Sequence, residues 1–115
     1  MEPAPLDLKI VRGDKFTCFF RVKQAGGTYI NLTGYTAAAQ IRQTDGDGAV
    51  AATFTAVIGD QTAFPGSVLL TLLKAVTTTL TPGTLVWDCE VIDGAGEPRT
   101  VLAGKVTVLK DVTHT

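Results

Sequence analysis

The chain has 115 residues, with ten Lys and Arg, eleven Asp and Glu, and a formal net charge of −1 at pH 7. A chain of this length is typical of one domain, and its balance of charge argues against a basic nucleic-acid-binding protein. Hydrophobic residues make up 45% of the sequence, which is enough for a core without metal or disulfide staples. No apolar run approaches the roughly 18 residues of a membrane span. Residues 1–5 lack the pattern of a secretory signal, so we expect synthesis and retention in a cytoplasm.

Apolar and polar residues alternate along most of the first half of the chain, which predicts β-strands. The predicted strands cover residues 6–11, 15–23, 35–42 and 50–58, with a short extended piece at 29–32. Glycine-containing turns are predicted between them, at residues 13–14, 24–28, 33–34 and 45–48. Each of these strands offers one apolar face to a core.

The second half of the chain continues the pattern. A loop at 59–67 carries Phe64 and Pro65 near its tip, and the strand at 68–73 is apolar on both faces. Residues 74–81 allow at most one short helical turn, because consecutive threonines are poor helix formers and Pro82 and Gly83 end it. Further strands are predicted at 85–92 and 100–110, joined by a hairpin loop.

Seven or eight short strands at intervals of about ten residues predict an all-β fold, a single antiparallel Ig-like β-sandwich. A barrel of the same strands is the alternative. The predicted domain spans residues 6–110, between a short N-terminal arm at 1–5 and a C-terminal tail at 111–115. The inward phase of the strands predicts one shared core, formed by Phe16, Phe20, Ile41, Phe54, Leu70, Leu72, Trp87 and Val106.

Two cysteines fall in phase with inward strand faces. Cys18 and Cys89 lie where an immunoglobulin domain places its inter-sheet pair, but Trp87 is not between them in the sequence, so the antibody order is absent. In a reducing compartment we expect both thiols to lie inside, close together and unbonded. A disulfide between them is the alternative.

The chain lacks the residues on which most enzymes depend. The only histidine is His114, next to the C-terminal residue, and the only serine, Ser67, lies in a turn without a nucleophile elbow. Two widely separated cysteines and one terminal histidine do not have the spacing of a standard zinc site, and no phosphate-binding glycine loop is present. We therefore expect no catalytic residue, no bound metal and no cofactor.

Two short motifs are interpreted as turns. Asp45-Gly46-Asp47-Gly48 resembles the start of a calcium loop, but alanines occupy the later ligand positions, Ala49 and Ala56. Arg12-Gly13-Asp14 is the tripeptide of integrin ligands, here placed at a junction between two strands.

Long stretches of the chain carry almost no charge. Residues 24–41 and 75–87 have none, and residues 48–73 have only Asp60. Neutral strands favour surfaces that a partner covers. Leu69 and Leu73 lie on the outward phase of their strand, and Phe64 and Pro65 form a rigid apolar loop tip, so these four residues are the predicted partner interface. The terminal segments 1–5 and 112–115 are candidates to add to a neighbour's sheet edge.

The order of motifs along residues 6–113 resembles a family of small tailed-bacteriophage virion proteins, in particular the Ig-like N-terminal domain of phage baseplate upper proteins. The motifs are Leu32-Thr33-Gly34-Tyr35-Thr36, Gln40-Ile41-Arg42, Thr79-Leu80-x-Pro82-Gly83, Trp87-Asp88-Cys89-Glu90-Val91, Leu102-x-Gly104-Lys105-Val106-Thr107-Val108 and Val112-Thr113. The sequence departs from the family at Trp87, where tyrosine is usual, and in its longer 59–67 loop.

The resemblance implies a non-enzymatic structural protein of the virion, assembled in the host cytoplasm as a tail, baseplate or fibre-attachment component. Its partners would be other virion proteins and copies of itself in a symmetric assembly, without nucleic acid, membrane or small-molecule substrate. A capsid decoration protein is the alternative within this class. A host receptor or glycan-binding module, with Trp87, Tyr29 or Tyr35 as a stacking platform, is the alternative from another class.

Overall fold

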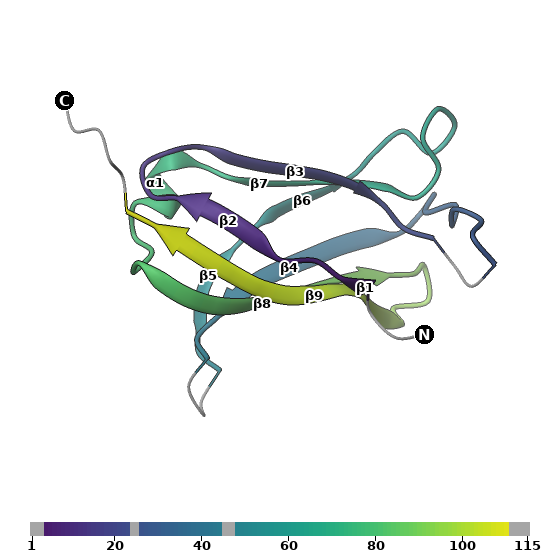
Figure 1. Cartoon of the computed structure of the whole chain (residues 1–115). Coiled ribbons are helices and arrows are strands. Elements are labelled where there is room, and N and C mark those ends of the chain that lie inside the picture. The colour runs from purple at the N-terminus through teal and green to yellow at the C-terminus, as the bar shows by residue number, and fades with distance from the viewer. Residues whose placement is uncertain (1–3, 24–25, 45–47, 111–115) are drawn as a thin grey trace.

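The computed structural model describes residues 4–23, 26–44 and 48–110 and shows a β-sandwich that is broadly immunoglobulin-like (Figure 1). The elements are β1 (Ala4–Pro5), β2 (Leu8–Val11), β3 (Phe16–Arg21), β4 (Thr36–Arg42), β5 (Val50–Thr53), β6 (Thr55–Ile58), β7 (Ser67–Leu72), α1 (Lys74–Thr77), β8 (Gly83–Ile92) and β9 (Pro98–Leu109). The larger sheet has the order β1-β9-β8-β4-β5, with β2 also paired to β9. The smaller sheet has the order β3-β7-β6 and forms the second layer.

The prediction of an all-β, Ig-like sandwich is confirmed, and its strands pair antiparallel everywhere except at the start of the described chain. Strands β1 and β2 both run parallel to β9, with Leu8 opposite Val106 and Ile10 opposite Val108. An alternating pattern determines which side chains face the core, but it leaves the partner and the direction of a strand open. The larger sheet is therefore mixed. Since Ala4 and Pro5 form β1, part of the predicted 1–5 arm belongs to the chain's own sheet.

A close backbone approach joins β1 and β2 along β9. Between the two strands, the Leu6 N–H donates to the Ala103 carbonyl at 3.0 Å, and the Asp7 carboxylate accepts the Lys105 N–H at 3.0 Å. A Cβ atom on Gly104 would lie 2.1 Å from the Leu6 carbonyl oxygen. Glycine at position 104 is thus what allows the N-terminal strands to lie against β9.

The single strand predicted at 50–58 is two strands in different sheets. β5 pairs with β4 in the larger sheet, and β6 pairs with β7 in the smaller one. The chain crosses between the layers at Phe54, whose ring is buried and whose N–H donates to the Ala39 carbonyl at 2.9 Å. This crossing closes one side of the sandwich.

The predicted core is largely confirmed. Ile41, Phe54, Leu70, Leu72, Trp87 and Val106 are buried. Phe16 and Phe20 pack against this core but are only partly buried, because β3 is an edge strand. The Phe54 ring lies between the Phe16 ring, 6.1 Å away, and the Trp87 ring, 5.9 Å away. The Trp87 indole donates from Nε1 to the Leu6 carbonyl at 2.7 Å, which satisfies its one polar atom.

The short helix falls within the predicted 74–81 segment and anchors the first turn. The Thr77 hydroxyl accepts from the Gly13 N–H at 3.2 Å and donates to the Asp14 carbonyl at 2.9 Å. Arg12 donates from Nη2 to the Thr78 carbonyl at 2.9 Å. The structure thus confirms the turn at 12–14, whereas the predicted turn at 45–48 falls mostly outside the described residues, as does the predicted tail at 111–115. Of the described residues, none form a helix long and apolar enough to span a membrane.

Candidate interaction surface

The outer faces of the two sheets differ in chemistry. The face of the larger sheet carries acidic and basic side chains from four adjacent strands, among them Arg42, Asp88, Glu90, Lys105 and Lys9. Such a surface is typically exposed to solvent, and its mixed charges disfavour association with the sheets of other chains.

The outer face of the smaller sheet carries a row of apolar side chains. Leu69 on the central strand β7 lies opposite Phe19 on β3 and opposite Val57 on β6. Their exposed fractions are 56% for Phe19, 39% for Leu69 and 53% for Val57. Phe64, 52% exposed, meets Phe19 edge-on with ring centroids 6.2 Å apart. Phe19, Val57, Phe64 and Leu69 are called the apolar patch below.

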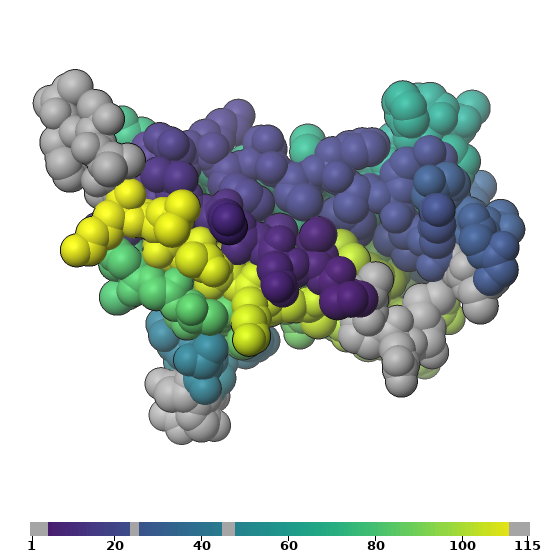
Figure 2. Space-filling view, viewed as in Figure 1, coloured from purple at the N-terminus to yellow at the C-terminus, as the bar shows by residue number. Residues whose placement is uncertain are grey.

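The loop at 59–67, drawn in teal, projects beyond the end of the small sheet (Figures 1 and 2). Its conformation depends on one side chain, that of Gln61. The Gln61 carbonyl oxygen accepts the Leu32 N–H at 2.9 Å and the Gly66 N–H at 2.7 Å. The Gln61 amide donates to the Gly59 carbonyl at 3.0 Å and to the Ser67 carbonyl at 3.2 Å. This one amide therefore provides hydrogen-bond partners for four backbone groups, three in the 59–67 loop and one at Leu32.

Gly66 and Arg21 also determine the position of the loop tip. Gly66 has φ +84°, and a Cβ atom there would lie 2.6 Å from the Val22 carbonyl oxygen, so the chain needs glycine at this point. Arg21 donates from Nε to the Pro65 carbonyl at 3.1 Å, while its guanidinium lies 3.7 Å from the centroid of the Tyr29 ring. The loop therefore presents Phe64 on a fixed support.

The four residues predicted as an interface have different positions. Phe64 and Leu69 belong to the apolar patch, whereas Pro65 is half-buried and contributes its carbonyl to Arg21. Leu73 is 57% exposed but lies four residues beyond Leu69, about 13 Å along an extended chain. The sequence reasoning missed Phe19 and Val57. The sequence did contain a signal for Phe19, because it is an aromatic residue at an outward-facing position of its predicted strand.

The two thiols lie in the core region and form no disulfide. Cys18 is half-buried, Cys89 is fully buried, and both are free. Burial raises the pKa of Cys18. Burial, and then the charges of Asp88, Glu90 and Cys18, raise the pKa of Cys89 to about 12. Because a thiol reacts as its thiolate, both cysteines are poor nucleophiles at neutral pH.

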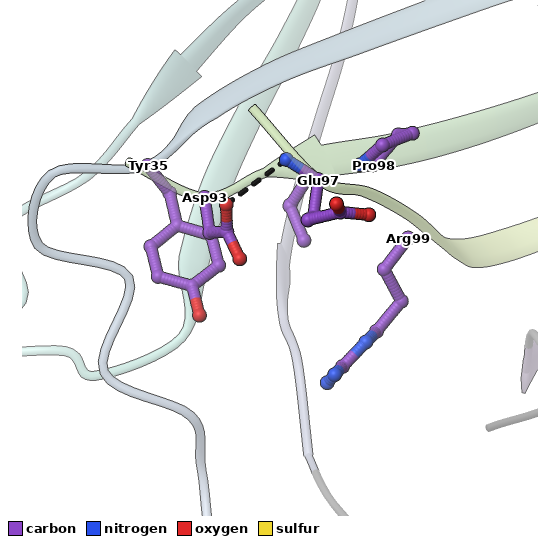
Figure 3. Close-up of a pocket in the computed structure, with 6 residues that line it drawn as sticks. Tyr35, Asp93, Glu97, Pro98 and Arg99 are labelled. Atoms are coloured by element: carbon purple, nitrogen blue, oxygen red, sulfur yellow. Dashed lines mark hydrogen bonds between the residues drawn. The ribbon is translucent and has the colours of Figure 1, made fainter. Parts of the chain in front are cut away.

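A shallow hollow of about 330 Å³ lies where β8 and β9 join at the end of the larger sheet (Figure 3). Its lining residues are Tyr35, Val91, Asp93, Glu97, Pro98 and Arg99. The Asp93 carboxylate accepts the Ala95 N–H at 2.9 Å and the Glu97 N–H at 3.0 Å, which fixes the hairpin loop. The side chains of Tyr35 and Arg99 extend to the same side of the strands in the close-up view.

The candidate metal ligands do not converge in the part of the chain that the structure describes. There, no three His, Cys, Asp or Glu residues lie together as a metal site would require. His114 lies outside those residues.

The fold and the surface together define a class, a β-sandwich domain with one charged and one apolar sheet face. No protein-family model matches the chain, and no curated protein sequence matches it. Among solved structures, the chain is similar to the crystal structure of CopC from Methylosinus trichosporium OB3b, with 12% sequence identity and a TM-score of 0.47. The similarity covers 95% of this chain and 89% of that chain. At this level it carries no argument about function.

Proposed function

We propose that this protein is a non-enzymatic structural component of a tailed-phage particle, a tail, baseplate or fibre-attachment protein that binds a neighbouring virion protein through the apolar patch. The observation that carries the assembly role is the contrast between the two sheet faces. One face is charged, while the other presents Phe19, Val57, Phe64 and Leu69 together. The assignment to a phage particle rests on the order of motifs along residues 6–113.

The apolar patch is large enough to contribute several kcal/mol to binding when a partner covers it. Fully burying a Val, Leu or Phe side chain contributes about 1.5–3 kcal/mol, so covering the exposed half of four such side chains contributes about 4 kcal/mol. This energy corresponds to a factor of about 1000 in an association constant. The Gln61 amide fixes the loop that carries Phe64. Less conformational entropy is therefore lost when a partner covers this side chain.

Incorporation into particles tests the proposal. The double variant Phe19→Ser, Phe64→Ser removes the two largest side chains of the apolar patch, both of them exposed, so the fold should persist. The matched control is Val86→Ser, an exposed apolar residue on the charged face of the larger sheet. In a phage complementation assay we expect the control in purified virions at the wild-type level and the double variant at least tenfold depleted.

Two results would overturn the proposal. One is the absence of the wild-type protein from purified virions, measured by mass spectrometry. The other is a folded double variant incorporated as well as the control. The position of the protein in a whole-particle reconstruction separates a tail component from the capsid decoration alternative, which would use the same surface.

A glycan-binding role is the second candidate, and one observation favours a single place for it. Trp87 is buried and offers no stacking platform, and Tyr29 already stacks with the Arg21 guanidinium, 3.7 Å from its ring centroid. Tyr35, in contrast, lines the hollow beside Asp93 and Glu97, which offer acceptors for sugar hydroxyls. Titration of the protein with host glycans, followed by NMR at Tyr35, tests this candidate. Absence of shifts at millimolar glycan removes it.

A further inference from the structure

The strand β3 has an open edge. Among the residues that the structure describes, β3 pairs only with β7. The Val22 N–H, one residue beyond β3 and in the same register, donates to the Gly66 carbonyl at 2.8 Å. Hydrogen-bonded and non-hydrogen-bonded positions alternate along an antiparallel pair. The backbone N–H and C=O groups of Thr17, Phe19 and Arg21 therefore face away from β7, toward solvent.

This edge lacks the features that protect other edges of the sandwich. The edge strands β2 and β6 are short, with four residues each. The edge strand β5 pairs with β4 through an irregular register. Short or irregular edge strands are poor templates for another chain. β3 has six residues, keeps one register along its length, and carries no charge or proline over residues 16–20. Long, regular, uncharged edges are templates for pairing with another chain.

The side chains of β3 also leave part of the core uncovered. Its inward residues Phe16, Cys18 and Phe20 are only partly buried, whereas Leu70 and Leu72 on the adjacent β7 are almost fully buried. In the space-filling view β3 is seen along its length on the near side of the molecule (Figure 2). An added strand beside β3 would cover these half-buried side chains and extend the row of the apolar patch.

Charge identifies the kind of strand that fits. Lys15 and Arg21 stand at the two ends of the uncharged stretch. Consider β3 paired antiparallel with β3 of a second copy. If the two Cys18 residues lie opposite each other, Lys15 of one copy lies opposite Arg21 of the other. If the two Phe19 residues lie opposite each other, Lys15 lies opposite Lys23. Like charges directly opposite each other in a sheet are destabilising, and opposite charges stabilise the pair. A second copy is therefore a poor occupant of this edge in the two registers that pair β3 over its whole length.

We propose that the open edge of β3 binds an extended segment of another virion protein, matching residues 15–21 in length, uncharged in its interior and acidic at both ends. The segment adds as a fourth strand to the smaller sheet, held by main-chain hydrogen bonds to Thr17, Phe19 and Arg21. This inference rests on the proposed function, because it names the partner chemistry of the assembly surface.

Peptide binding to the full-length protein tests the inference. The probe is the capped, fluorescently labelled peptide Glu-Val-Thr-Val-Thr-Val-Glu, which is acidic at both ends in either orientation. Its counterpart carries Lys in place of both Glu residues. By fluorescence anisotropy, we expect the wild-type protein to bind the acidic peptide about tenfold more tightly than the basic one.

Two variants separate the backbone from the charge. Thr17→Pro removes an N–H that faces solvent, which an edge strand tolerates, and should abolish peptide binding while circular dichroism remains native. Lys15→Glu should abolish the preference for the acidic peptide. Its matched control, Lys105→Glu, makes the same charge change on the outer face of the larger sheet and should leave the preference intact.

Equal binding of both peptides to the wild-type protein would overturn the inference, as would an equal effect of Lys15→Glu and Lys105→Glu. Wild-type binding by folded Thr17→Pro would overturn it too. A dimer of the protein alone that Thr17→Pro dissociates would identify a second copy as the occupant and overturn it as well. If the peptides fail while the Phe19→Ser, Phe64→Ser protein is still excluded from virions, the strand proposal fails and the proposed function stands. Absence of the wild-type protein from virions ends both.

Discussion

Replacing Gln61 by alanine should cost a large part of the stability of the domain, although the residue belongs to a surface loop. The side chain accepts the N–H groups of Leu32 and Gly66 and donates to the carbonyls of Gly59 and Ser67. Leu32 and Ser67 are fully buried, so water has poor access to the backbone groups that alanine would leave behind.

The magnitude follows from the two N–H groups that lose their acceptor. A buried donor left without a partner costs about 1–3 kcal/mol, and the carbonyls, each with a second lone pair, cost less. We therefore expect Gln61→Ala to lower the free energy of unfolding by about 3 kcal/mol. For a chain of this length, such a loss corresponds to a fall in Tm of about 12 °C.

Urea denaturation measures this loss, with the fluorescence of the single buried tryptophan, Trp87, as the probe. The control is Asp60→Ala in the same loop. The Asp60 carboxylate accepts the Thr62 N–H at 2.9 Å and the Ala63 N–H at 3.3 Å, but both bonds are exposed, so we expect a loss below about 1 kcal/mol. A Gln61→Ala protein within about 1 kcal/mol of the wild type, or an equal loss in the control, would refute the reasoning.

Three other substitutions test the core and its thiol. Trp87→Phe leaves the Leu6 carbonyl without its indole donor and should cost about 2 kcal/mol by calorimetry; a neutral result would show that this bond is dispensable. Gly104→Ala forces a Cβ against the Leu6 carbonyl and should cost at least about 2 kcal/mol, whereas Gly94→Ala, which meets no neighbouring atom, should change stability by less than about 0.5 kcal/mol. Burial raises the pKa of Cys89 to about 12, so above pH 9 the unfolded chain loses the thiol proton first and the folded state becomes less stable as pH rises. In this range the unfolding free energy should fall faster for the wild type than for Cys89→Ala, by at most about 1.4 kcal/mol per pH unit, and parallel pH curves would contradict the expectation.

Alternation of apolar and polar residues was enough to predict which side chains face inward. Leu85, Trp87, Cys89 and Val91 on β8 are all buried as that pattern requires. The pattern could not predict that β2 pairs parallel with β9, because alternation is the same for either direction of a partner. Nor could it locate the sheet crossing at Phe54, where the inward phase continues unbroken from one sheet to the other.

The candidate surface was predictable only in part for a related reason. Phe64 and Leu69 were visible in the sequence as apolar residues in a loop and on an outward phase. Phe19 and Val57 join them only through the register of three strands that are distant in the chain. A contiguous surface depends on strand order, which local sequence does not contain.

The parallel pairing of the first strands with the last one has a consequence for synthesis of the protein. The hydrogen bond between Lys105 and Asp7 joins residues 98 positions apart. While the ribosome adds roughly 5–20 residues each second, β2 must wait for β9, and β8 meanwhile lacks one of its two neighbours. The larger sheet therefore closes only after β9 has emerged from the exit tunnel. Such non-local pairing is typical of domains that fold in milliseconds to seconds, so the unpaired edges of β8 and β2 are exposed to other chains until β9 joins them.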